Sequence, residues 1–405
     1  MRRLGSALCI IILVGCSRMP ATSSLPATSQ PTTNGAMFHT SSGKFQTMFV
    51  FKTNHNGIIP AGGVLGVSGT LYGATNFGGD ANKECYPGHG CGTVFSISTP
   101  GSESVLYRFA AGKDAARPYA GLIDVSGTLY GTTQIGGKSD KASNKGTVYA
   151  ITPSGSETVL HAFDGKDGND PRASLTSLNG TLYGTTYYGG STETGTVFSI
   201  TTSGAEHVLH SFTGGTDGAL PLASLTAYNN ILYGTTSSGG TNNAGTVFAI
   251  SPGGSNYTVL YSFTGGADGA FPFAGLAELN GTLYGTTQQG GAHKKGTVFA
   301  ITPSGSESVI HSFGAKADGS EPFSGVTVLN GQLYGTTAYG GAKKEGTIFT
   351  ITPSGSETVL HSFPGGPGGR VPYATLTTMS GSLYGTTVWG GRTGAGVGTV
   401  FEYTP

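Results

Sequence analysis

One sequence motif is repeated seven times along this 405-residue chain, and the repetition restricts the fold more than any other feature. Each copy reads roughly L-N-G-T-L-Y-G-T-T-x-x-G-G, then a variable loop, then G-T-V-F-x-I-T-P-S-G-S-E-T-V-L-H-S-F. The tyrosine of the Leu-Tyr-Gly triplet falls at Tyr72, Tyr130, Tyr183, Tyr233, Tyr284, Tyr334 and Tyr384. A fixed period of about fifty residues is typical of an architecture in which every unit builds the same substructure.

Each unit has the pattern of four short strands. In the unit at residues 171–212, runs rich in β-branched and aromatic residues lie at 173–178, 181–186, 196–200 and 207–212. Asn179-Gly180 joins the first two runs and is a typical hairpin turn, because both residues tolerate positive φ. No segment has helical periodicity. Four strands per unit predict one blade of a β-propeller.

The two ends of the chain are predicted to complete a ring. The last unit stops at Glu402-Tyr403, just after its third strand, and a strand at 45–51 stands alone before the first unit. We expect this strand to pair with residues 398–403, because closure removes exposed strand edges. The sequence therefore predicts an all-β protein, a seven-bladed β-propeller of four-stranded antiparallel blades over residues 45–405.

Residues 1–15 resemble a bacterial lipoprotein signal peptide. Arg2 and Arg3 precede an apolar stretch at 8–14, which is too short to span a bilayer core of about 30 Å. The stretch ends in Leu-Val-Gly before Cys16, the lipobox pattern, which implies cleavage before Cys16 and lipidation of this cysteine. An ordinary secretion signal that contains a cysteine is the alternative.

Residues 16–44 are expected to be a disordered tether. They are rich in Ser, Thr and Pro, so they bury too little apolar surface to order themselves. Ser17 follows the lipidated cysteine, where an aspartate would have favoured the inner membrane. We therefore expect an exported protein, lipid-anchored to the bacterial envelope at the outer membrane or cell surface, with the membrane as its first partner.

Two cysteines remain after Cys9 and Cys16 are assigned to the N-terminal segment. Cys85 and Cys91 lie in a loop found only in the first unit, and an oxidising compartment predicts a disulfide between them. A metal site that adds His89 is the alternative, although no second cysteine pair supports it. The chain has 21 basic and 21 acidic residues, so we expect no nucleic-acid partner. We expect a monomer.

The repeated motif resembles the GloVer tandem-repeat family, also called choice-of-anchor proteins because members share the repeat but differ in how they attach to the cell. The resemblance rests on LYGTT-xx-GG and GTVF-x-ITPSG, for example at 182–190 and 195–200, and covers about residues 45–405. It implies a propeller-like fold at a bacterial surface. It identifies no catalytic residues in this chain.

Residues that occur in every unit are interpreted as scaffold. The repeated tyrosines are expected to pack between blades, since a single binding site would not need seven identical rings. A histidine recurs in one register of the fourth strand at His161, His210, His311 and His361, and tyrosine replaces it elsewhere. This position therefore favours an amphipathic ring over a metal ligand. Glutamates in the Ser-Glu turns, namely Glu157, Glu307 and Glu357, are interpreted as hairpin residues.

A repeated aspartate precedes the proline that joins one blade to the next. It occurs at Asp167, Asp217, Asp268 and Asp318. An Asx-type turn explains its place before glycine. Calcium bound by this aspartate and backbone oxygens is the alternative, for which one carboxylate per loop is a thin ligand set. We expect no cofactor and keep these four residues as weak metal candidates.

Residues that differ between units are the candidates for function. The loop after Thr-Thr varies most, and five of its aromatic residues are expected on one face of the propeller: Phe77, Tyr187, Tyr188, Tyr339 and Trp389. Exposed rings beside polar amides suit contact with a sugar or a peptide. Packing of the rings onto neighbouring loops is the alternative.

Three functions are compatible with these observations. The address, the tether and the absence of a recognisable catalytic motif favour a non-catalytic module that binds a glycan or a protein, so we expect no enzyme activity. A hydrolase or lyase that acts on an envelope polysaccharide is the first alternative, and it requires a set of acid and base residues unique to some blades. A purely structural surface component is the second.

Overall fold

The computed structural model describes residues 43–52, 55–79, 85, 89–98, 101–137, 144–314, 317–391 and 397–405. The predicted signal peptide, the predicted lipidation site Cys16 and all but the last two residues of the predicted tether lie outside this part of the chain. The described residues form strands, turns and one short 3-10 helix, η2 (Gly366–Gly368), and none of them builds a helix long and apolar enough to cross a membrane.

Six blades follow one another along the chain, and the seventh combines both ends. The first three contain β2 (Leu65–Val67), β3 (Thr70–Thr75), β4 (Thr93–Ser98) and β5 (Ser102–Arg108); β7 (Ile123–Val125), β8 (Thr128–Gly136), β9 (Thr147–Ile151) and β10 (Glu157–Ala162); and β11 (Thr176–Leu178), β12 (Thr181–Thr186), β13 (Thr196–Thr201) and β14 (Glu206–Ser211). The next three contain β15 (Thr226–Tyr228), β16 (Ile231–Thr236), β17 (Thr246–Ile250) and β18 (Thr258–Ser262); β19 (Ala277–Leu279), β20 (Thr282–Thr287), β21 (Thr297–Ile301) and β22 (Glu307–Ser312); and β23 (Thr327–Leu329), β24 (Gln332–Thr337), β25 (Thr347–Ile351) and β26 (Glu357–Ser362). The last contains β28 (Thr377–Met379), β29 (Ser382–Trp389), β30 (Thr399–Thr404) and β1 (Lys44–Val50).

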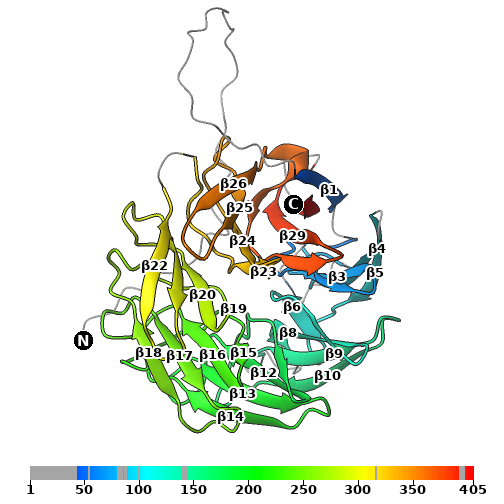
Figure 1. Cartoon of the computed structure of the whole chain (residues 1–405). Helices are drawn as coiled ribbons and strands as arrows, with labels where there is room; N and C mark the ends of the chain where they lie inside the picture. The colour runs from blue at the N-terminus through cyan, green and yellow to red at the C-terminus, as the bar shows by residue number, and fades with distance from the viewer. Residues whose placement is uncertain are drawn as a thin grey trace, which may run out of the picture. The chain divides into compact units, whose positions relative to one another are not determined.

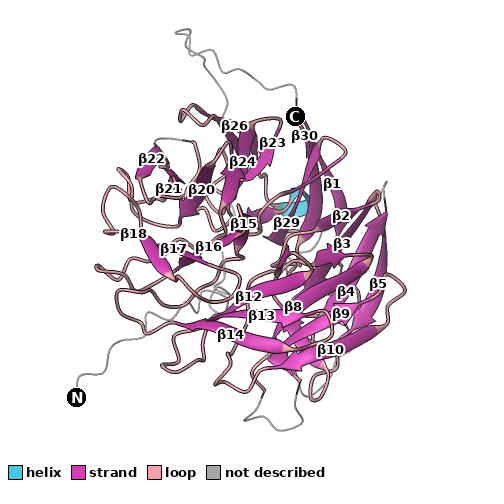
Figure 2. Ribbon diagram, turned by 60° about the horizontal axis from the view of Figure 1, so that its bottom comes forward, coloured by secondary structure: helices cyan, strands magenta, loops and turns pink. Residues whose placement is uncertain are grey.

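Two additional short strands extend the second and seventh sheets. They are β6 (Ala115–Pro118), which pairs with β8, and β27 (Arg370–Pro372), which pairs with β29. In every blade the first strand is three residues long and contacts the corresponding strand of the next blade, including β28 with β2. The seven blades are therefore arranged in a closed ring, which Figures 1 and 2 show from two directions.

The N-terminal strand closes the ring as predicted. β1 pairs antiparallel with β30, with Phe45 opposite Tyr403 and Val50 opposite Thr399, and a bulge interrupts the register between Thr47 and Phe49. Phe51 follows the strand, is buried and packs into the first blade. The first described strand thus holds the last blade to the first.

The hydrophobic core is divided among the seven blade junctions. At one junction, Tyr183 and Phe212 of the third blade pack against Leu232, Phe248 and other apolar residues of the fourth. Corresponding clusters join each of the other neighbouring pairs, including the seventh and first blades. The predicted inter-blade role of the repeated tyrosines is confirmed.

The glycine of the Leu-Tyr-Gly triplet makes room for a ring in the adjacent strand. Gly184 of β12 pairs with Phe198 of β13, and a Cβ atom on Gly184 would lie 2.5 Å from Cζ of Phe198. The Phe198 ring packs edge-on against Phe163 of the preceding blade, with 5.2 Å between centroids. A side chain at the glycine would displace this ring, which explains why glycine and phenylalanine recur together.

The predicted disulfide is present in the first blade. Cys85 and Cys91 are bonded, with 5.3 Å between their Cα atoms, and both side chains are buried at the junction with the second blade. The backbone carbonyl of Cys91 accepts a hydrogen bond of 2.7 Å from the amide of Arg117 in the second blade's connection. Cys91, at the end of the disulfide loop, therefore supports the backbone of β6 at Arg117.

Candidate functional site

The connections that lead into the innermost strands line a central cavity of about 270 Å³. Each connection has a proline, and the residue after this proline lines the cavity: Ala61, Tyr119, Arg172, Leu222, Phe273, Phe323 and Tyr373. We call these seven residues the collar. The proline is the same in all seven units, whereas the collar residue changes, so the collar is where the repeated scaffold presents a non-repeated surface.

Four aromatic residues of the collar form a continuous arc. The Phe323 ring is stacked between Phe273 and Tyr373, at centroid distances of 5.8 Å and 4.7 Å. Tyr373 meets Tyr119 edge-on at 6.2 Å, since the blade between them contributes only the small side chain of Ala61. All four rings are half-buried. They offer apolar faces at the edge of a cavity, an arrangement that suits a flat, partly apolar ligand.

The variable loop after Thr-Thr is held beside the collar by buried hydroxyl groups. Thr186 Oγ1 lies 2.8 Å from Thr196 Oγ1 and donates a 2.8 Å hydrogen bond to the carbonyl of Tyr188. The same loop forms a β-bridge between Tyr188 and Asn169 of the connection. Equivalent threonine pairs occur in all seven units. The loop and the connection therefore emerge on one face, as expected.

The structure places the five predicted aromatic residues differently from one another. Tyr188 and Tyr339 are each 37% exposed, and Phe77 and Trp389 are half-buried. Tyr187 corrects the expectation of an exposed ring, because it is 9% exposed and the guanidinium of Arg172 covers it at 4.3 Å from the ring centroid. In these loops the first variable residue thus supports the surface, and the second contributes to it.

Sequence reasoning missed the collar and the residues that position it. The residue before each repeated proline has a left-handed backbone: Ile59, Arg117, Asp170, Leu220, Phe271, Glu321 and Val371 have φ between 55° and 60°. This conformation costs about 1–2 kcal/mol for a residue other than glycine. Inter-blade hydrogen bonds hold it, for example from the Val371 amide to the Glu345 carbonyl at 2.9 Å. Residues with such strain cluster at binding and active sites in proteins. Here the strain recurs in all seven connections.

A second pocket of about 310 Å³ adjoins the collar at Arg172. Its lining includes Arg117, Gln134, Asn144 and Asp170. Arg172 forms an ion pair with Asp170 at 2.5 Å, whereas Arg117 lies over the ring of Phe77 at 4.9 Å. This lining is polar and carries two guanidinium groups, and Tyr188 is the one residue in it that was among the candidates from the sequence.

The repeated aspartates close their own loops. Asp217 and Asp268 accept hydrogen bonds from the backbone amides of Thr213 and Thr264, four residues earlier, at 3.0 Å and 2.7 Å. Asp318 accepts one from Gly314 in the same way. This is a turn-stabilising role, as expected, but the bond reaches backward along the chain where an Asx turn reaches forward.

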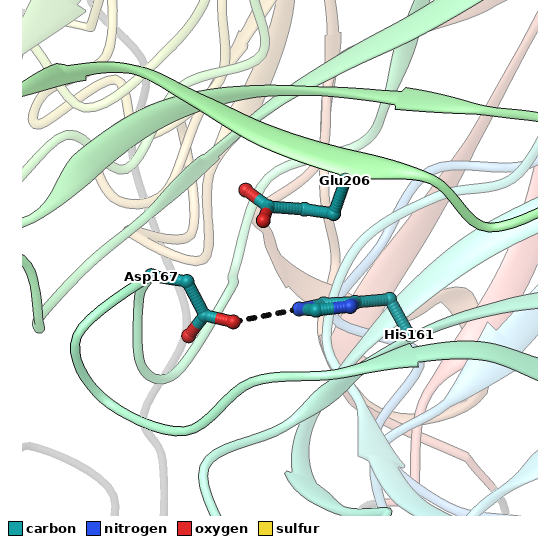
Figure 3. A group of neighbouring side chains, drawn as sticks. All are labelled: His161, Asp167 and Glu206. Atoms are coloured by element: carbon teal, nitrogen blue, oxygen red, sulfur yellow. Dashed lines mark hydrogen bonds and ion pairs between the residues drawn. The ribbon is translucent and has the colours of Figure 1, made fainter.

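One of these aspartates belongs to a cluster of possible metal ligands, shown in Figure 3. Asp167 Oδ2 lies 2.8 Å from Nε2 of His161, and Glu206 of the next blade faces both, with one ligand atom of each residue within 4.8 Å of the others. Burial raises the pKa of Glu206 to about 7, and the nearby carboxylates of Asp167 and Asp164 add to the shift against the opposing effect of His161. A nitrogen and two oxygens could hold a divalent cation such as zinc.

The same cluster recurs at other junctions with aromatic replacements. Corresponding trios are Tyr107, Asp114 and Glu157; His210, Asp217 and Tyr257; Tyr261, Asp268 and Glu307; and His311, Asp318 and Glu357. His210 stacks on Tyr257 and His361 stacks on Phe45, each at 3.8 Å between ring centroids. A place that accepts tyrosine or phenylalanine serves packing between blades. The interpretation of the recurring histidines as ring positions therefore explains all of these junctions.

Comparisons with known proteins agree with this architecture. The family model for the Gloeobacter/Verrucomicrobia repeat matches residues 24–239 and 207–401. No curated protein matches the sequence. Among solved structures, virginiamycin B lyase from Staphylococcus aureus aligns with a TM-score of 0.60 at 15% identity, over 90% of this chain and 100% of that one. A putative 6-phosphogluconolactonase from Bacteroides uniformis aligns with a TM-score of 0.47 at 16% identity, over 73% and 84%. The likeness to the lyase is one of fold.

Proposed function

This chain belongs to the Gloeobacter/Verrucomicrobia repeat family, and from that premise we propose that it is a non-catalytic binding protein of the bacterial envelope whose ligand is a glycan. The signal-like segment and Cys16 support the address. The glycan lies on the collar, over the central cavity. The ligand chemistry rests on the geometry of the collar, because the family match identifies no ligand.

The observation that carries the proposal is the contrast between repeated and non-repeated positions. The scaffold residues occur in unit after unit, yet the seven residues after the repeated prolines are of five different types and line one cavity. If the positions after the prolines served only the fold, they could carry the same residue in every unit, as the scaffold positions do. The variation therefore supports a ligand that is itself asymmetric and contacts several blades at once.

The arc of Phe273, Phe323, Tyr373 and Tyr119 supports a sugar in particular. Aromatic faces contact the apolar C–H faces of pyranose rings, while adjacent polar groups bind hydroxyls. Exposed Tyr188 and the neighbouring amides of Asn169 and Gln134 supply these polar groups at the same edge. A long polysaccharide could cross the cavity from the arc to this edge.

A polysaccharide hydrolase or lyase is the alternative that the fold allows. Such an enzyme needs acid and base groups at the ligand site. In the described part of the chain, the glutamates with raised pKa lie on the outermost strands, at repeated places away from the collar. Asp170 beside the collar is held by Arg172. These positions favour binding without turnover.

Fluorescence titration of the full-length protein tests the proposal. The sequence has one tryptophan, Trp389, which lies half-buried in a Thr-Thr loop beside the collar. We expect one class of envelope or plant polysaccharide to give a saturable change in its emission and a higher melting temperature. Phe323→Ala should abolish both effects. The control is Ile231→Ala, an exposed apolar residue at the opposite end of its blade.

Three results would contradict the proposal. Breakdown of the bound glycan would favour the enzyme alternative. Equal binding by wild type and Phe323→Ala would remove the collar from the site. If no polysaccharide binds, a protein ligand or a structural role becomes the better explanation, and capture of partners from the intact envelope would separate these two.

A further inference from the structure

We infer that the pocket beside the collar binds the carboxylate of an acidic sugar, so that the ligand is a polysaccharide containing hexuronate. This inference rests on the proposed glycan-binding function and specifies the ligand's charge. The pocket has a volume of about 310 Å³ and lies where the second and third blades meet. Its chemistry differs from that of the aromatic arc, because guanidinium, carboxylate and carboxamide groups dominate its lining.

Arg117 is the main reason to expect an anion. Its Nε atom is buried without a hydrogen-bond partner, and no carboxylate of the described residues lies within ion-pair distance. The guanidinium lies over the Phe77 ring at 4.9 Å. Burial lowers the pKa of Arg117 and the nearby Arg172 adds to this effect, whereas the carboxylate of Asp170 opposes it. A half-buried guanidinium with an unbonded Nε atom is costly, and an anionic ligand would offset that cost.

Arg172, the other arginine of the pocket, is already paired with a carboxylate. Arg172 donates to Asp170 Oδ2 from Nε at 2.9 Å and from Nη2 at 2.5 Å. The pocket therefore contains two cations and one carboxylate in its described lining. Its charge favours a negative group, and Arg117 is the cation available to bind one.

The remaining polar groups distinguish a sugar acid from a simple anion. Asp170 Oδ1 is buried without a hydrogen-bond partner, so it requires a donor such as a hydroxyl group. Two of the three carboxamide oxygens are occupied, since Gln134 Oε1 accepts from Asn76 and Asn144 Oδ1 accepts from the Gly136 amide. Each carboxamide also carries an NH₂ group, which is a hydrogen-bond donor. A ligand with a carboxylate and hydroxyls satisfies this set, because the carboxylate accepts from the guanidinium and a hydroxyl donates to Asp170. Sulfate, which carries no proton near neutral pH, would have no hydrogen to donate to Asp170.

The scaffold holds Arg117 in place before any ligand arrives. Its backbone is left-handed, with φ 60°, and its amide donates to the carbonyl of Cys91 at the end of the disulfide loop. At the same position the other six connections carry Ile59, Asp170, Leu220, Phe271, Glu321 and Val371. Arg117 is thus the single cation in a sevenfold set, in a place that costs strain to occupy.

The pocket continues into the collar. Arg172 lines both cavities, and Tyr188, 37% exposed, lines the pocket. A uronate bound at Arg117 would direct the next sugars along Tyr119 towards Tyr373 and Phe323. The expected ligand is therefore a chain in which an acidic residue occupies the pocket and adjacent residues stack on the arc.

Calorimetric titration of the full-length protein tests the inference. The probes are oligomers of galacturonate, glucuronate and guluronate, each paired with its carboxyl-reduced form, which has the same sugars without charge. We expect at least one acid to bind at least tenfold more tightly than its reduced form. Arg117→Met should raise the Kd for that acid by about tenfold to a hundredfold and leave the reduced form unchanged. Arg117→Lys should recover part of the affinity.

The controls separate this inference from the proposed function. Arg108→Met removes an exposed arginine at the end of β5 and should leave every Kd unchanged. Arg117→Met should not lower the melting temperature, because it removes an unpaired cation and keeps an apolar stem against Phe77. Equal affinity for acids and reduced forms would overturn the inference and leave glycan binding intact. Absence of any glycan binding would overturn both, and Arg117-dependent binding of poly-glutamate alone would point to a protein ligand.

Discussion

The blade junctions and the collar are built by the same repeat, yet they differ in almost every physical respect. A junction such as that of Tyr183, Phe212 and Phe248 consists of buried apolar residues that recur around the ring. The collar residues vary in type around the ring, all but Ala61 are half-buried, and they follow a strained backbone position. The junctions are thus stabilised by burial of apolar surface, whereas the collar remains partly exposed and its strained backbone costs free energy.

This difference shows how a repeat can be stable and specific at once. Each junction contributes stabilisation of the same kind, so no single connection is needed for the core. The connections are then free to carry different side chains on one side of a fixed ring. Arg117 and Phe323 lie on opposite sides of the repeated proline in different blades, and we assign them different parts of one ligand.

Opening the ring should have the largest effect on the blade junctions, and therefore on their contrast with the collar. Deleting residues 44–50 removes β1 from the seventh blade and exposes the edge of β30. We expect the cooperative thermal transition to disappear, since every junction depends on closure. Differential scanning calorimetry of the full-length chain provides the measurement. A permuted chain, in which the same strand follows Pro405 through a Ser-Gly turn, should melt like the parent. A deletion variant that still melted sharply at the original temperature would rule out this dependence.

A junction ring should matter more than a collar ring. Phe198 is fully buried against Phe163, so Phe198→Ala should reduce the free energy of unfolding by about 3–5 kcal/mol. Phe323→Ala at the collar should cost less than about 2 kcal/mol, because its ring is only half-buried. Urea denaturation followed by circular dichroism compares the two. Equal losses would mean that the collar is core, and the contrast between the two regions would fail.

The junctions should also make stability depend on pH. Burial raises the pKa of Glu157, Glu206, Glu307 and Glu357 from 4.5 to about 7. The folded chain then holds protons that the unfolded chain releases, so stability is fully present below pH 4.5 and is lost as pH rises through 7. Burial lowers the pKa of His210, His311 and His361, which has the opposite effect below pH 6.5.

The useful window therefore lies between about pH 7 and 8, where the unfolded histidines, with an ordinary pKa of 6.5, are mostly neutral and oppose the glutamates little. We expect the melting temperature to fall across it and the slope to become smaller when the four glutamates are replaced by glutamine. Glu193→Gln, in an exposed loop, serves as the control and should leave the slope unchanged. A flat profile in the wild-type protein would show that the junction carboxyls are ionised in the folded state.

The ring was predictable because its determinants are local and repeated. Gly184 beside Phe198, the threonine pairs and the hairpin Asn179-Gly180 all lie within one unit, so a single unit showed the blade. Contacts that join two blades were not visible in the same way. The contact between His161 and Glu206 can be predicted only when the order of the blades in the ring is known. The burial of Tyr187 depends on Arg172 of the connection, which covers its ring.

The collar escaped the sequence analysis for a conformational reason. A residue before proline is normally extended, which would direct the connection along the blade. Here all seven such residues are left-handed, among them the β-branched Ile59 and Val371, and the residue after the proline reaches the cavity. The sequence shows the proline and the variation beside it, but the backbone torsion is imposed by inter-blade hydrogen bonds such as Val371 to Glu345.

Relief of this strain is the smallest effect that we expect, and it tests the collar alone. Val371→Gly keeps the amide bonded to Glu345 and removes a left-handed strain of about 1–2 kcal/mol, against about 0.5–1 kcal/mol for the greater freedom of unfolded glycine. Urea denaturation should show a gain in stability of up to about 1 kcal/mol. The control Val328→Gly, in β23 of a neighbouring blade, should destabilise, because that backbone is extended. If both variants lost the same stability, the backbone before the prolines would be no more strained than that of the strands. The argument that backbone strain marks the collar as a binding surface would then fail.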